Sequence, residues 1–183
     1  MFEVDSCGWL TKISQCKSPN FNERPDGCEI SLLVIHNISL PAGQFDTGYI
    51  SQLFTNSLNC DAHPSFDDLK GVKVSAHCMI ARNGEITQYV SFNDRAWHAG
   101  VSSFNNVENC NDYSIGIELE GTDDLAYTSE QYQSLAVLTQ TILKTYPAIG
   151  KNIVGHCDIA PGRKSDPGNA FNWSGYFSML AEK

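Results

Sequence analysis

The chain has 183 residues, of which 42% are hydrophobic and 18% are charged, and its formal net charge is −9. This length and composition fit one soluble globular domain, spanning residues 1–183, with a substantial hydrophobic core. The chain has no block of Lys and Arg and no apolar run near 18 residues. These absences disfavour a general nucleic-acid binder and exclude a membrane span.

The cysteines and the first five residues indicate the cellular compartment in which the protein is expected to act. The seven cysteines are odd in number, widely spaced and without a C-x-x-C pair. Residues Met1–Asp5 include acids where a signal peptide needs a basic region followed by an apolar stretch. We therefore expect reduced thiols, no Cys-rich structural zinc site and a cytoplasmic location.

The first third of the chain predicts a leader, a strand and a long connection. Residues 1–29 are rich in Ser, Asn, Pro, Asp and Gly and predict an irregular leader lying on the surface. The apolar run Ile30–Ile38 predicts a strand buried on both faces, with His36 at its carboxyl end, where ligands gather in open sheets. Taken alone, His36 is better explained as a core histidine, but beside the 153–168 stretch the metal-ligand interpretation is favoured. The connection 39–71 contains a helical candidate near Tyr49–Leu58 and is expected to wall one side of a site.

Three further strands are predicted in the middle of the chain. Asn83-Gly84 is a strong hairpin signal, and it joins the alternating run Val72–Ile80 to a return strand, Ile86–Val90. Residues 113–121 have a period of two, which places Ser114, Gly116, Glu118 and Glu120 on one face. That face is either solvated or the floor of a cleft, with Gly116 clearing room for Glu118.

The last third predicts two helices around an irregular stretch. Residues 128–131 form a capping box that opens a helix, and Pro147 ends it. Asn172-Trp173 begins a short closing helix. Between them, residues 153–168 read as a short strand followed by a loop carrying His156, Lys164 and Asp166.

Several side chains could bind a metal ion. Three protein ligands with one open position are the pattern of catalytic zinc. By spacing alone, Asp158 and Asp166 are close competitors. The candidate ligands are His36, His77, His98, His156, Cys157, Asp158 and Asp166.

Five short motifs, in order along almost the whole chain, resemble the zinc-dependent N-acetylmuramoyl-L-alanine amidases. Within that family they are most similar to the cytoplasmic branch that acts on anhydro-muropeptides (the AmpD type). One difference from the wider family is Ala76, where several members have a Tyr before the residue matching His77. The motifs are Leu33–Pro41, Val74–Cys78, Arg95–Ser102, Ser114–Asp123 and Gly155–Pro161 with Lys164–Gly168.

The resemblance implies a fold and a set of roles. The fold is α/β (α+β), a mixed central sheet flanked by helices, shared with peptidoglycan recognition proteins. His36, His156 and Asp166 are expected to bind Zn²⁺, which settles Asp166 over Asp158. Glu118 is expected to act as general base and acid, and Lys164 to stabilise the oxyanion.

The implied activity is hydrolysis of the amide between the lactyl group of (1,6-anhydro-)N-acetylmuramic acid and L-alanine, in cell-wall recycling. The expected partner is a small muropeptide, without nucleic acid or membrane, and the expected state is a monomer. Two alternatives are an exported or phage-like amidase acting on intact peptidoglycan and a non-catalytic peptidoglycan-recognition module. The candidate substrate contacts are Asn37, Arg95, Trp97, His98 and Arg163.

Overall fold

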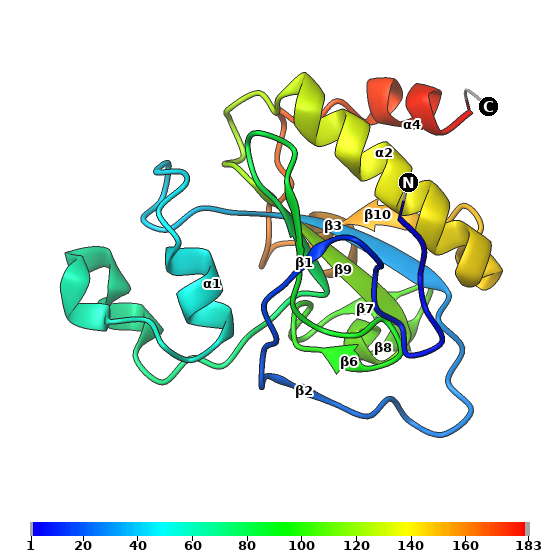
Figure 1. The fold of residues 1–183 in the computed structure, drawn as a ribbon, viewed down its shortest axis with the longest axis horizontal. Helices are drawn as coiled ribbons and strands as arrows, with labels where there is room; N and C mark the ends of the chain where they lie inside the picture. The colour runs from blue at the N-terminus through cyan, green and yellow to red at the C-terminus, as the bar shows by residue number, and fades with distance from the viewer. Residues whose placement is uncertain (1, 182–183) are drawn as a thin grey trace.

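The centre of the molecule is a mixed six-stranded sheet with the order β1-β5-β4-β9-β3-β10 (Figure 1). The computed structural model describes residues 2–181. Strands β4, β9, β3 and β10 are parallel to one another, and β5 is antiparallel to β4. The mixed sheet predicted from the sequence is confirmed. Its strands are β1 Ser14–Gln15, β3 Leu32–Ile38, β4 Cys78–Ile80, β5 Ile86–Gln88, β9 Ser114–Glu120 and β10 Ile153–Gly155.

Two small antiparallel ribbons and several helices surround this sheet. One ribbon pairs β2 (Phe21–Asn22) with β6 (Arg95–Ala96), and the other pairs β7 (Ser103–Phe104) with β8 (Val107–Glu108). The α-helices are α1 Tyr49–Phe54, α2 Ser129–Thr145, α3 His156–Ile159 and α4 Trp173–Ala181. The 3-10 helices are Cys60–Ala62, Pro64–Leu69, Cys110–Asp112 and Pro147–Ile149. Among residues 2–181, no helix is long and apolar enough to cross a bilayer.

Helix α2 starts where the capping box predicts. The Thr128 side chain accepts a hydrogen bond from the Gln131 backbone at 3.1 Å, and the Gln131 side chain accepts one from the Thr128 backbone at 3.1 Å. The helix ends at Thr145, two residues before Pro147. These reciprocal bonds satisfy amide groups that the first turn leaves unpaired.

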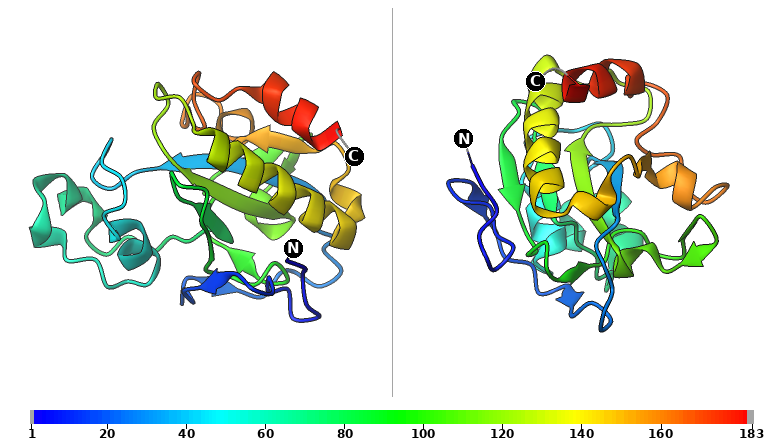
Figure 2. Two further views of the ribbon diagram at one scale, coloured as in Figure 1. Left: turned by 45° about the horizontal axis from the view of Figure 1, so that its top comes forward. Right: turned by 90° about the vertical axis from the view of Figure 1, so that its right-hand side faces the viewer.

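The main core lies between one face of the sheet and helices α2 and α4. Leu33 and Ile35 of β3, Ile115 and Ile117 of β9 and Leu138 of α2 are fully buried there. Figure 2 shows α2 lying along the sheet with α4 beside it, while α1 and the segment after it extend away from both. Since side chains alternate along a strand, the opposite face of β3 and β9 is left for other groups.

The structure differs from the sequence prediction in the leader and in the strand lengths. The 1–29 segment is largely irregular, but it contributes β1 and β2 and places Leu10 in the core with 1% exposure. The alternating run Val72–Ile80 is a strand only from Cys78. Before it, the Ser75 backbone N–H donates to the Trp97 carbonyl at 3.2 Å, and the Ser75 hydroxyl donates to the Asn20 carbonyl and accepts from the Trp97 backbone N–H. The return strand ends at Gln88, two residues earlier than predicted.

Candidate active site

The candidate site lies at the carboxyl ends of three adjacent parallel strands. His36 is the fifth residue of β3 and pairs in register with Glu118 of β9. His156 directly follows the neighbouring strand β10 and begins α3. The position is the one that the sheet topology favours for ligands, and it lies on the sheet face opposite α2.

Three side chains converge there on one point. The Nδ1 atoms of His36 and His156 are 2.9 Å apart. The Oδ2 atom of Asp166 lies 3.2 Å from the first and 3.0 Å from the second. All three residues are buried, and within the described part of the chain they are the one group of His, Cys, Asp or Glu side chains arranged to hold a metal ion.

The structure also shows why Asp166 rather than Asp158 joins this group. The Asp158 carboxylate accepts a hydrogen bond from the Gly155 backbone at 2.7 Å and thereby caps the short helix α3. Asp166 is brought inward because its own carbonyl accepts a hydrogen bond from the Cys157 amide at 3.0 Å. Tyr127, which the sequence analysis did not single out, donates its hydroxyl to the carbonyl of the next residue, Pro167, at 2.7 Å.

Glu118 forms the floor of a cleft, so the solvated-face alternative is wrong. Every residue of β9 is buried, and Glu118 is 8% exposed. Its Oε2 atom is buried and has no hydrogen-bond partner. Burial raises the pKa of this carboxyl well above its ordinary value, the Asp166 carboxylate adds to the rise and Lys164 opposes it. This carboxyl oxygen lies beside the ligand cluster and is free to bond a molecule in the cavity.

A cavity of about 200 Å³ connects these groups. Its walls include the ligand triad, Glu118 and Lys164, together with Phe54 of α1. The Lys164 side chain is exposed, and its backbone is fixed by a hydrogen bond to the Ala160 carbonyl at 3.0 Å. The cavity thus places a buried carboxyl group and a lysine next to a metal site.

The electrostatics of the triad follow from its burial. Burial lowers the pKa of His36 to about 4, which keeps its ring neutral and a lone pair free at neutral pH. Burial alone would raise the pKa of Asp166, but its hydrogen bonds with His156 and His36 lower the pKa below the ordinary value. Two imidazoles and one carboxylate are a donor set that suits a catalytic zinc ion.

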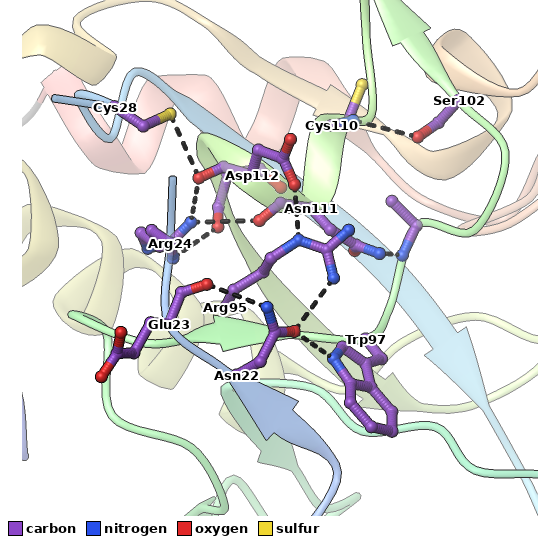
Figure 3. Close-up of polar contacts among 12 residues, drawn as sticks. Asn22, Glu23, Arg24, Cys28, Arg95, Trp97, Ser102, Cys110, Asn111 and Asp112 are labelled. Carbon is purple, nitrogen blue, oxygen red and sulfur yellow. Dashed lines mark hydrogen bonds and ion pairs between the residues drawn. The ribbon is translucent and has the colours of Figure 1, made fainter. Parts of the chain in front are cut away.

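The candidate substrate contacts fall into two groups. Asn37, Trp97 and His98 line the cavity. Arg95 and Arg163 line a second, larger cavity of about 690 Å³ behind the 100–103 segment. Arg95 forms an ion pair with the Asp112 carboxylate (Figure 3), and Arg163 donates to the Val101 carbonyl at 2.7 Å.

All three candidate contacts that line the cavity already have partners in the protein, and those of His98 are the His36 ring and the Ser114 hydroxyl. The Asn37 side chain donates to the Asp123 carboxylate at 2.8 Å. Trp97 donates its indole N–H to Asn22 at 2.7 Å, which leaves its ring face as the surface available to a ligand (Figure 3).

His77 is a core histidine. Its Nδ1 atom accepts a hydrogen bond from the Gly116 backbone at 3.0 Å, and its Nε2 atom lies 3.1 Å from the Asp94 carbonyl. Arg24, which no sequence pattern indicated, reaches in from the leader and donates to the Asp112 carbonyl at 2.8 Å and the Asn111 carbonyl at 3.1 Å (Figure 3).

Comparison with known proteins agrees with this geometry. A family model of N-acetylmuramoyl-L-alanine amidases matches residues 26–169. The chain is 55% identical over 174 residues to the 1,6-anhydro-N-acetylmuramyl-L-alanine amidase AmpD of Salmonella typhimurium, covering 95% of this chain and 93% of that protein.

Solved structures show the same likeness. The crystal structure of a selenomethionine AmpD derivative superposes with a TM-score of 0.94 at 53% identity, covering 96% of this chain and 98% of that one. AmpDh3 of Pseudomonas aeruginosa in complex with an anhydromuramic pentapeptide superposes with a TM-score of 0.66 at 32% identity, covering 85% of this chain and 61% of that one.

The match extends over the strands and loops that supply His36, Glu118, His156 and Asp166, so the likeness covers the metal site as well as the fold. The chain belongs to the N-acetylmuramoyl-L-alanine amidase family.

Proposed function

We propose that the chain is a zinc enzyme that hydrolyses the amide between the lactyl group of 1,6-anhydro-N-acetylmuramic acid and the L-alanine of a muropeptide, in cell-wall recycling. The observation that carries this proposal is the convergence of His36, His156 and Asp166 with Glu118 and Lys164 in one cavity. We propose the 1,6-anhydro form of the sugar because two relatives that are 55% identical are named 1,6-anhydro-N-acetylmuramyl-L-alanine amidase.

His36, His156 and Asp166 would hold the zinc ion through two Nδ1 atoms and one carboxylate oxygen. Zinc bound in this way lowers the pKa of water from about 15.7 to about 7 and polarises a carbonyl. Glu118 takes the proton of the attacking water and delivers it to the departing L-alanine amine, which leaves only when protonated. Lys164 stabilises the negative charge that develops on the carbonyl oxygen.

We further propose that the protein acts in the cytoplasm as a monomer. All seven cysteines are free thiols, which suits a reducing compartment. One chain supplies every group of the site, so no second copy is needed to complete it.

The test of the function is to incubate the zinc-loaded protein with an anhydro-muramoyl tripeptide and to look for the free tripeptide by mass spectrometry. We expect release that stops when a chelator is added and returns with zinc. Intact peptidoglycan is the second substrate: faster release from it than from the fragment would favour the exported or phage-like alternative. Binding of the fragment without release would favour a recognition module.

The role of Glu118 is tested with Glu118→Gln. Removing the acid–base group should lower kcat by about 10²–10⁴-fold. The metal content should stay at that of the parent, because Glu118 is outside the ligand triad. The matched variant Asp166→Ala should instead lose the metal. Parental turnover by Glu118→Gln would remove Glu118 from the mechanism.

A further inference from the structure

In both histidine ligands, the ring nitrogen that faces away from the metal position has a partner in the protein. The Nε2 atom of His36 lies 2.9 Å from Nδ1 of His98. The Nε2 atom of His156 lies 3.1 Å from the carbonyl oxygen of Ala99. Two consecutive residues of one loop therefore meet the outer nitrogens of both ligands, although the ligands are 120 residues apart in the chain.

The proton positions follow from this arrangement. The Nδ1 atoms of His36 and His156 face each other and Asp166, so a metal ion there needs a lone pair on each Nδ1. The single proton of each neutral ring must then lie on Nε2. The Ala99 carbonyl can only accept, and Nδ1 of His98 must accept as well, which puts the proton of His98 on its own Nε2, 3.1 Å from the Ser114 hydroxyl.

The 98–99 segment is held in place from several sides. The Asn111 side-chain oxygen accepts hydrogen bonds from the backbone N–H groups of His98 at 3.1 Å and Ala99 at 2.8 Å. The His98 ring lies directly on Gly116, where a Cβ atom would come within 2.5 Å of the ring. Arg163 donates a further hydrogen bond to the Ala99 carbonyl at 2.6 Å.

Asn111 and Ser114, which hydrogen-bond His98, are themselves held in place by Arg24. Arg24 donates to the main-chain carbonyl of Asn111 at 3.1 Å (Figure 3) and to that of Ser114 at 2.8 Å. These are the two residues whose side chains bond the His98 backbone and ring. Since β9 supplies Ser114 and Gly116, the strand that carries Glu118 also sets the orientation of His98.

We propose that His98 and Ala99 are positioning residues that fix both histidine ligands in the Nδ1-binding tautomer and orientation. Partners of this kind orient metal-bound imidazoles and raise their basicity. His98 lines the cavity, but both of its ring nitrogens are engaged inside the protein. The inference concerns metal binding and stands whichever amide the site hydrolyses.

The test compares two variants of almost equal size, His98→Asn and His98→Leu. The Asn side-chain oxygen can take the place of Nδ1 and accept from His36, whereas Leu offers no acceptor. Zinc dissociation constants are measured by competition with a chromophoric chelator, and the visible spectrum of the cobalt-loaded protein reports the ligand geometry. We expect His98→Leu to bind zinc 10–100-fold more weakly with an altered cobalt spectrum, and His98→Asn to recover most of the affinity.

Two results would overturn the proposal. One is parental zinc affinity in His98→Leu, and a raised KM in the same variant would make His98 a substrate contact. The other is an equal loss of zinc affinity in both variants, which would indicate packing alone. The melting temperature of each metal-free variant checks folding.

A measurement on the unmodified protein tests the proposal without depending on how well the variants fold. Ring ¹⁵N shifts of the zinc-loaded protein should show protonated Nε2 atoms on His36 and His156, and a metal-bound Nε2 on either would overturn the proposal.

Discussion

Lys164, the group proposed to stabilise the oxyanion, has an exposed side chain. It lines the cavity, while its backbone is fixed to the turn after α3. Lys164→Ala should lower kcat by about 10²–10³-fold, the range seen when one donor to a developing oxyanion is removed. Zinc content should be unchanged, because Lys164 is not one of the ligands. Steady-state kinetics with metal analysis measure both.

The matched control for this variant is Lys151→Ala, which removes another exposed lysine far from the cavity. It should keep the parental kcat. If Lys164→Ala also kept it, the positive charge would have no part in the reaction.

At the residue scale, the sequence predicted the ligands better than their supports. His36 and Glu118 could be placed because a strand has a period of two and ends where ligands gather. The choice between Asp158 and Asp166 could not be made from spacing, since it depends on the bond from Gly155 to Asp158. The contact of His36 with His98 spans 62 residues and leaves no periodic trace in the sequence.

At the scale of whole elements, helix α2 packs in the core but contributes no residue to the cavity. The Thr128 hydroxyl caps its first turn and also donates to the Arg82 carbonyl at 2.8 Å. Thr128→Ala should lower the free energy of unfolding by about 1 kcal/mol. Because α2 packs on the sheet face opposite the cavity, kcat per folded molecule should not change.

Denaturant unfolding and activity assays test this prediction together. Thr145→Ala, at the exposed last position of the same helix, should alter the unfolding free energy by less than Thr128→Ala. A fall in kcat of Thr128→Ala at full folding would mean that α2 is coupled to the site.

The elements whose bounds the sequence predicted most closely are the long ones. β3 and β9 have seven residues each and α2 has 17, enough to show a pattern. β1 and β2 have two residues each and depend on partners far along the chain, so their local sequence carries no signal. Arg24 was missed for the same reason, since its acceptors lie 68–90 residues away.

At the scale of the whole molecule, buried phenols should set the alkaline limit of stability. Burial raises the pKa of Tyr89 to about 12, above its ordinary value of 10.0. The neutral phenol is therefore favoured in the folded state, so its contribution is complete below pH 10 and is lost as the pH rises toward 12. A shift of two pKa units corresponds to about 3 kcal/mol at most.

Unfolding free energies measured between pH 8 and 12 test this expectation. The fall above pH 10 should be less steep in Tyr89→Phe than in the parent, whatever the two stabilities are at pH 8. Equal slopes would show that Tyr89 ionises alike in the folded and unfolded chains.

The proposed zinc ion should stabilise the whole fold, because the residues that would hold it come from β3, from the start of α3 and from the loop that follows α3. Binding to the folded state alone adds about 2.7 kcal/mol at a free zinc concentration 100 times the dissociation constant. For a chain of this size, that corresponds to a rise in melting temperature of roughly 5–10 °C.

Asp166→Ala should lose the zinc-dependent rise. Asp158→Ala should melt lower with and without zinc, since it loses the cap of α3, yet it should keep the full rise. A zinc-dependent rise that disappears in Asp158→Ala and persists in Asp166→Ala would exchange the roles of the two carboxylates.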